Sequence, residues 1–216
     1  MPDHPETTKA KKVIGHAKDS VAGFLDAFEV VRKARDAGRG APTDEEQDLA
    51  RAALVFAAAG LDSCIKHLIK DSIVSLSNFD EKVGDLLSRF VRNLLEVDPK
   101  HRLVSALLAE SSRSDLIDSY IYELTGSSLQ SFDQLASASG ALGIKVEILT
   151  SNKKDVQRIF AARNDIIHEL HVNIDGEVGQ RERNSRSKTQ LDVDAKLLLS
   201  IAEQFIKLVN EKLDNA

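Results

Sequence analysis

The stretch LVFAAAGLDSCIKHLIKDSI, residues 54–73, is apolar on nearly all sides when it is wound into a helix. A surface helix carries its apolar residues on one face, whereas a helix that is apolar all round is enclosed by other elements. The stretch contains no proline, and its alanines and leucines are strong helix formers. We therefore predict a long helix at the centre of a helical bundle.

The sequence also marks where this helix begins. Thr43 and Glu46 have the spacing of a capping box, in which each side chain accepts a hydrogen bond from the backbone N–H of the other residue. Asp44 and Glu45 place negative charge in the first turn, which the helix dipole favours. From this start the helical pattern continues to about Ser77.

Other helical patterns precede and follow the central helix. Residues 1–17 have the composition of a polar lead-in, and apolar residues then recur at helical spacing over 21–31, until the AGRGAP stretch. The last helix is expected to begin at Asp192 or Asp194, and the helix before it to be capped by Ser151. Further helices are predicted over residues 78–97, after a restart at Asp98-Pro99 over 103–109, then over 116–124 (closed by Gly126), 132–138 (closed by Gly140) and 191–213, with a tight turn at Asp175-Gly176.

The overall composition agrees with an all-α fold. The chain has 216 residues, of which 42% are hydrophobic but only 5% aromatic, and it contains no Trp and only four prolines. This length suits one domain with a substantial apolar core. We therefore expect a single domain over residues 18–216, built as an up-and-down helical bundle with short helical insertions.

Charge and cysteine content exclude several classes of protein. A net charge of −5 argues against broad binding to a polyanion, so any contact with nucleic acid needs a local basic patch. Cys64 is the only cysteine, which excludes an intramolecular disulfide and a cysteine-based zinc site, and its apolar surroundings indicate a core residue. We find no signal-peptide pattern and no apolar run near the ~20 residues of a membrane span. The sequence thus predicts a reduced, cytoplasmic protein without membrane contact and without a cofactor.

The most distinctive polar cluster lies in FAARNDIIHELHVN, residues 160–173. Arg163 is followed directly by Asn164, and His168 comes later on the same predicted helix. This helix is expected to end here, so that the polar cluster reaches solvent. Apolar residues would anchor it to the bundle: Val156, Ile159, Phe160, Ile166 and Ile167.

RNDIIH, residues 163–168, resembles the signature of the HEPN superfamily, which is an arginine, usually a polar residue next, and a histidine four to six residues on. GLDSCIKHLIKDSI, residues 60–73, is similar to the early core helix of the RiboL-PSP branch, which is related to the RNase L nuclease domain. The resemblance implies a helical bundle that commonly dimerises. In many members it implies a metal-independent endoribonuclease in phage defence, toxin–antitoxin or RNA-processing systems.

That activity would give Arg163, Asn164 and His168 roles in RNA cleavage. The 2′-hydroxyl of RNA attacks the neighbouring phosphate, which needs one proton removed from the hydroxyl and one delivered to the leaving 5′-oxygen. An imidazole, whose ordinary pKa is about 6.5, can do either near neutral pH. The planar guanidinium of an arginine fits two phosphate oxygens, and an asparagine can bind the phosphate or orient the imidazole. The products would be a 2′,3′-cyclic phosphate and a 5′-hydroxyl, and no metal is required.

Helix geometry adds a constraint on this site. Five helical steps turn a side chain by about 500°, so Arg163 and His168 point about 140° apart on an ideal helix. They meet on one phosphate if the helix unwinds near Ile167, if the arginine bends round, or if a two-fold dimer brings two clusters together. We therefore expect a homodimer, with RNA as its substrate and an antitoxin or other inhibitory protein as a further partner.

The motif residues also have simpler interpretations. Arg163 could form an ion pair on the bundle surface with Asp165, Asp155 or Glu169. The HELH sequence, residues 168–171, suggests zinc, but its histidines are three residues apart where the metalloprotease pattern needs four, and no third ligand is evident.

The residues after the motif are candidates for substrate binding. His171 suits the C-terminal end of a helix, where the dipole favours it, or a contact with RNA. The basic run RERNSRSK, residues 181–188, is either a solvated loop or a contact with the RNA backbone. Its cations are Arg181, Arg183, Arg186 and Lys188.

An alternative function is a catalytically inactive HEPN module that binds a protein, a nucleotide or RNA. The acidic net charge and the absence of a second catalytic motif in the sequence support it. An active nuclease should slow the growth of its host unless His168 is changed, whereas a binding module should not.

Overall fold

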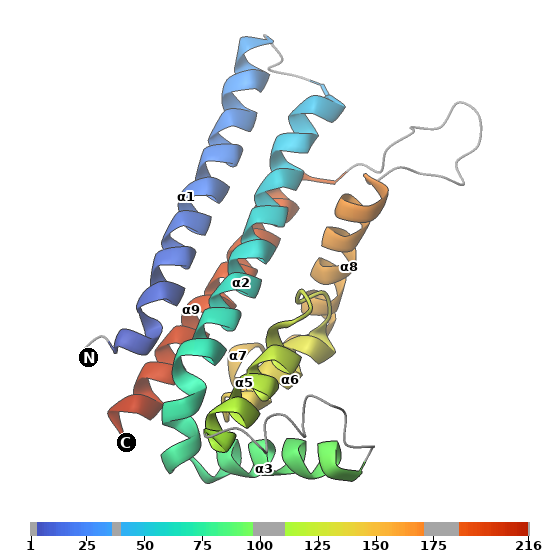
Figure 1. Ribbon diagram of the computed structural model, residues 1–216. Coiled ribbons are helices and arrows are strands. Elements are labelled where there is room, and N and C mark those ends of the chain that lie inside the picture. Colours follow the sequence, from blue (N-terminus) through green and yellow to red (C-terminus); the bar gives the residue numbers. More distant parts are fainter. Residues whose placement is uncertain (1–3, 36–39, 97–110, 171–185, 216) are drawn as a thin grey trace.

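The computed structural model describes residues 4–35, 40–96, 111–170 and 186–215, and over this part of the chain the protein is helical with no strand. Figure 1 shows α1, α2 and α9 as long helices that run side by side, with α8 beside α2 and shorter helices near one end. The predicted all-α helical bundle is therefore confirmed. The helices are α1 (Pro5–Ala34), α2 (Asp44–Phe79), α3 (Glu81–Glu96), α5 (Ser112–Thr125), α6 (Phe132–Ala141), α7 (Val146–Leu149), α8 (Lys153–Glu169) and α9 (Lys188–Asp214).

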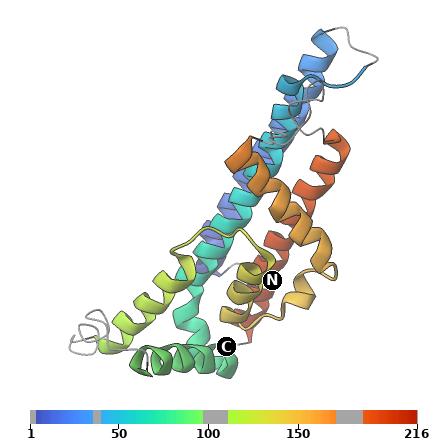
Figure 2. The ribbon, with the colours of Figure 1, turned by 90° about the vertical axis from the view of Figure 1, so that its right-hand side faces the viewer.

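α2 is the central element of the bundle, as its sequence predicts. It contacts α1, α3, α5, α6, α8 and α9, and Figure 2 shows α3 and α5 projecting sideways from the end where α2 stops. Leu54, Leu61 and Leu68, each seven residues from the next, are completely buried. The capping box is also confirmed, because the side chain of Thr43 accepts from the N–H of Glu46 and the carboxylate of Glu46 accepts from the N–H of Thr43.

The apolar character of α2 corrects the expectation that no apolar run in the chain approaches the length of a membrane span. By length and composition alone, α2 could cross a membrane, since it contains an apolar stretch of 18 residues. However, 56% of that stretch is buried inside the protein. This burial is typical of the core helix of a soluble protein, whose apolar surface is covered by its neighbours.

The polar lead-in expected over residues 1–17 is wrong for the residues that the structure describes. α1 begins at Pro5, and its first turns bury Thr7, Ala10 and Ile14. The apolar stripe was hard to detect because it consists partly of small residues among lysines. The hydroxyl of Thr7 donates to Asn210 Oδ1 of α9 at 2.9 Å, so this first turn is fixed to the last helix.

Several predicted helix ends need correction. α8 is capped by Asn152 and not Ser151. α6 continues through Gly140 to Ala141, and the chain turns afterwards at Gly143, whose φ is +67°. Gly126 ends α5 as predicted, while α7 was not predicted. The predictions for 98–99, 103–109 and 175–176 lie outside the described residues.

The start of α9 is a further correction. The helix begins at Lys188, after Ser187, and not at Asp192 or Asp194. Asp194 lies inside the helix and is only 1% exposed. It does not cap the helix, which begins six residues earlier, and its carboxylate instead accepts hydrogen bonds from Arg158 of α8.

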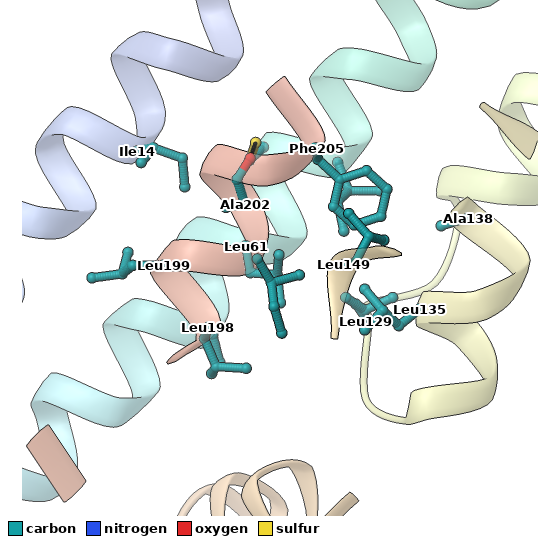
Figure 3. Close-up of a cluster of buried hydrophobic side chains, with 14 of the residues drawn as sticks. Ile14, Leu61, Leu129, Leu135, Ala138, Leu149, Leu198, Leu199, Ala202 and Phe205 are labelled. Carbon is teal, nitrogen blue, oxygen red and sulfur yellow. Dashed lines mark hydrogen bonds between the residues drawn. The ribbon is translucent and has the colours of Figure 1, made fainter. Parts of the chain in front are cut away.

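The core lies between α1, α2 and α9 and extends under the shorter helices. In Figure 3, Leu61 lies among Ala202, Phe205 and Leu198 of α9, with Ile14 of α1 on one side and Leu129 on the other. Cys64 is a core residue, as predicted. It is completely buried, and burial raises the pKa of its thiol to about 12.

Candidate functional site

The motif lies on the last two turns of α8, and buried apolar residues hold that helix in place. Val156, Ile159, Phe160 and Ile166 are buried, and α8 contacts both α2 and α6. These four anchors are confirmed. Ile167 was also expected to be an anchor, but it is 40% exposed and lies on the outer side of the helix.

A half-buried ion pair fixes the middle of α8 to α9. The guanidinium of Arg158 donates from Nη1 to Asp194 Oδ2 at 2.7 Å and from Nη2 to Asp194 Oδ1 at 2.6 Å. These hydrogen bonds raise the pKa of Arg158, against the effect of burial. Gln190 also donates to Asp194 Oδ1, at 2.8 Å. This pair sets the position of α8 five residues before the motif, and no spacing rule in the sequence points to it.

Arg163 is held by a neutral partner rather than by a carboxylate. Its Nη1 donates to Oδ1 of Asn164 at 3.0 Å. The proposed ion pairs with Asp155, Asp165 or Glu169 are not formed, and no carboxylate among the described residues lies within 4.0 Å of its guanidinium nitrogens. Its Nε is buried and has no hydrogen-bond partner in the part of the chain that the structure describes. The guanidinium thus keeps donors for an anion.

Asn164 links Arg163 to the loop between α5 and α6. Its Nδ2 donates to the backbone carbonyl of Gln130 at 3.3 Å. The amide therefore has its donor directed at the loop and its acceptor directed at Arg163. Gln130 was not predicted as part of the site, because it participates through its backbone, which its side-chain type does not reveal.

His168 is exposed in the last turn of α8. The helix does not unwind near Ile167, since it is regular to Glu169 and ends at Leu170, which has a left-handed φ of 49°. Arg163 and His168 are therefore separated around the helix by the angle of about 140° that regular geometry gives. Within one chain, α8 does not turn both side chains toward one point.

The basic residues after the motif are only partly described. His171, Arg181 and Arg183 lie outside the described residues. The guanidinium of Arg186 lies 3.8 Å from Asp165, and the ammonium group of Lys188 lies 2.6 Å from Glu29 of α1.

A further contact of the basic run leads back to α2. The backbone N–H of Arg186 donates to Gln47 Oε1 at 3.2 Å, so Arg186 lies between α2 and α8. Asp165, which was considered as a partner for Arg163, instead faces Arg186. Both described cations of the run thus have acidic neighbours within the chain.

The described residues contain no group of three or more His, Cys, Asp or Glu side chains that could hold a metal ion. Of the two HELH histidines, His168 belongs to the described residues and His171 lies outside them.

Comparison with known families identifies this bundle. The sequence model of the RiboL-PSP-HEPN family matches residues 25–215, which is most of the chain and includes the motif. The chain therefore belongs to the RiboL-PSP-HEPN family, as the resemblance of its motif indicated. This membership suggests a nuclease or RNA-related role. No curated protein and no solved structure matches the chain significantly.

Proposed function

We propose that this protein is a metal-independent endoribonuclease whose reacting groups are Arg163 and His168. The observation that carries the proposal is the lack of a counter-ion for Arg163 among the described residues. Arg163 is a partly buried cation on a helix that also presents an exposed histidine. A partly buried charge without a counter-ion is unfavourable unless a ligand supplies the opposite charge.

In this mechanism the guanidinium of Arg163 binds the phosphate and stabilises the charge that grows on it in the transition state. The 2′-oxygen forms a bond to phosphorus while the bond to the 5′-oxygen breaks. One imidazole takes the proton of the 2′-hydroxyl, and a second group gives a proton to the leaving 5′-oxygen. Asn164 keeps the guanidinium in place through its Oδ1.

A homodimer supplies the second imidazole. Because α8 stays helical through the motif, two copies of the cluster must converge across a two-fold axis for His168 to act on both sides of the phosphate. Ile167 and Leu170, which are 40% and 65% exposed, provide an apolar surface next to His168 for this contact.

The test is RNA cleavage in the presence of EDTA by the wild type, by His168→Ala and by His16→Ala. His16 is an exposed histidine on α1, so its variant controls for the loss of a surface imidazole. We expect cleavage by the wild type and His16→Ala, products with a 2′,3′-cyclic phosphate, and none from His168→Ala. Equal cleavage by wild type and His168→Ala would overturn the proposal.

The dimer has its own test. Ile167→Glu places a charge on the proposed contact, and Ile148→Glu does the same at an isoleucine of α7 that is 55% exposed. Sedimentation should show a monomer for Ile167→Glu and a dimer for Ile148→Glu. The cleavage assay should show that only Ile167→Glu has lost nuclease activity. A dimer that survives in Ile167→Glu would contradict this interface.

The biological setting that we propose is a defence or toxin–antitoxin system in the cytoplasm, with an inhibitory protein as a further partner. Slower growth of host cells that express the wild type, but not of cells that express His168→Ala, would support a toxic nuclease. Equal growth of both would favour the inactive binding module.

A further inference from the structure

The loop between α5 and α6 connects the motif to the middle of α2. This loop, residues 126–131, supplies the Gln130 carbonyl that binds Asn164. One residue earlier, the N–H of Leu129 donates to Asp62 Oδ1 of α2 at 2.8 Å. A continuous series of hydrogen bonds therefore runs from Asp62, through two consecutive loop residues and Asn164, to the guanidinium of Arg163.

The series is anchored at its α2 end. Asp62 Oδ2 lies 2.9 Å from the ammonium group of Lys66, one helical turn later, which leaves Oδ1 for the loop. Leu129 is 7% exposed, and Figure 3 shows its side chain next to Leu135 of α6. The next peptide is fixed as well, because the N–H of Gln130 donates to Gln134 Oε1 at 2.7 Å.

Side-chain packing alone does not fix the 126–131 loop where it faces α2. A cavity of about 170 Å³ lies there, and its walls include Asp62, Lys66 and Ser128. Where side chains do not fill the space, the position of the backbone depends more strongly on its hydrogen bonds. Asp62 and Leu129, the two partners of the hydrogen bond, both line this cavity.

The direction of each bond matters for Arg163. A carbonyl only accepts, so Gln130 requires Nδ2 of Asn164, and this orientation leaves Oδ1 free to accept from Arg163. An arginine only donates, so the opposite orientation of the amide would leave both partners unsatisfied. Since no carboxylate among the described residues holds Arg163, its position depends on this amide.

We propose that Asp62 is a positioning residue for Arg163, and that it acts through the 126–131 loop and Asn164. This inference rests on the proposed nuclease function, in which Arg163 binds the scissile phosphate. It assigns a role to a residue of α2 that is outside the motif and that does not itself touch the reacting atoms.

The first test does not depend on cleavage. The side-chain N–H signals of Asn164 and Arg163 are compared by NMR in the wild type, Asp62→Ala and Asp62→Asn. Alanine removes the acceptor for Leu129, whereas asparagine keeps an oxygen in the same place. We expect Asp62→Ala to shift both signals and to speed their exchange with water, and Asp62→Asn to leave them close to the wild type. Unchanged signals in Asp62→Ala would overturn the proposal.

The second test is kinetic. We expect Asp62→Ala to lower kcat by about 10- to 100-fold with little change in KM, because a misplaced group mainly loses its interaction with the transition state. Asp62→Asn should restore kcat. A general loss of structure would instead affect both variants and lower the unfolding midpoint, which is measured alongside. If Asp62→Ala does not fold, Asp62→Ser is used, because serine is too short to reach Leu129.

The two proposals fail in different ways. If His168→Ala cleaves RNA as well as the wild type, the nuclease site is wrong, and the NMR comparison still decides whether Asp62 positions Arg163. If His168→Ala is inactive but Asp62→Ala has the kcat of the wild type, the nuclease stands and the role of Asp62 is refuted.

Discussion

Gly60 of α2 faces Ala17 of α1 so closely that a Cβ atom on Gly60 would lie 2.5 Å from the Cβ of Ala17. The two longest helices of the described chain therefore meet at a point where only glycine fits. Since Gly60 lies two residues before Asp62, this close contact also fixes the part of α2 that reaches the 126–131 loop.

Gly60→Ala is expected to destabilise the protein by up to about 2 kcal/mol, because overpacking costs about 1–3 kcal/mol and the gain in helix propensity offsets about 1 kcal/mol of it. The control is Gly23→Ala on α1, where an added Cβ meets nothing within 4 Å. That variant should gain about 0.5–1 kcal/mol from propensity alone. Urea unfolding measures both changes, and the opposite order of stability would refute the packing argument.

The Arg158–Asp194 pair should respond unequally to the loss of each partner. Arg158→Ala leaves a carboxylate that is 1% exposed, with Gln190 as its remaining side-chain donor among the described residues. Asp194→Ala leaves a guanidinium that is 39% exposed and can turn to water. We expect Arg158→Ala to cost about 2–3 kcal/mol and Asp194→Ala less, because leaving a buried charge unpaired costs more than exposing one. Thermal unfolding of the two variants checks the order.

Asp80 should contribute to acid unfolding. Burial alone would raise its pKa, but the Lys212 ammonium and the N–H groups of Val83 and Lys82 hold that pKa below its ordinary value of 3.8. A lowered folded pKa means that the unfolded state binds the proton more readily, so the stabilisation is present above the ordinary value and is lost as pH falls through the folded pKa. In Asp80→Asn, the free energy of unfolding should therefore fall less steeply than in the wild type as the pH drops below about 4. If the free energy of unfolding of Asp80→Asn fell as steeply at low pH as that of the wild type, this role would be excluded.

Cys64 should resist thiol reagents in the folded protein. Burial raises the pKa of its thiol to about 12, so the reactive thiolate is scarce at neutral pH as well as inaccessible. Labelling with a disulfide reagent at pH 8 should follow global unfolding and accelerate in denaturant. Rapid labelling of native protein would show that the α2–α9 contact opens locally.

Arg163→Lys should lower RNA cleavage by about 100-fold or more, because a lysine keeps the charge but lacks the planar pair of donors. The matched control is Arg113→Lys on α5. Arg113 also donates to an asparagine, Asn78, at 2.7 Å, but it is exposed and outside the motif. Cleavage assays of both variants at equal concentration separate a loss specific to the site from a general effect of the exchange.

The parts of the fold that could be predicted from sequence are those fixed by local patterns. The capping box at Thr43 and the all-round apolar character of residues 54–73 depend only on neighbouring residues, and both predictions were right. Asp194 was mistaken for a helix cap because its partner is Arg158, 36 residues away. The start of α1 was missed because small residues such as Ala10 carry a weak apolar signal although they are buried.

In the candidate site, too, the local features could be predicted from the sequence and the contacts between distant residues could not. The motif residues were recognisable from their types and spacing. The partner of Arg163 was not, since Asn164 rather than a carboxylate holds it. Gln130 was missed because only its backbone contributes, and the role proposed for Asp62 depends on a contact between residues 67 positions apart.

The order in which α8 gains its support has a consequence for synthesis on the ribosome. α1 and α2 are adjacent in the sequence and can pair as soon as both have emerged, but α8 is tied to α9 through Arg158 and Asp194, and α9 is translated later. The helix that carries Arg163 and His168 can pack against α2 and α6 as soon as it is made, but it gains its ion pair to α9 only later. A nascent chain would therefore complete the contacts of the motif helix only after α9 has left the exit tunnel.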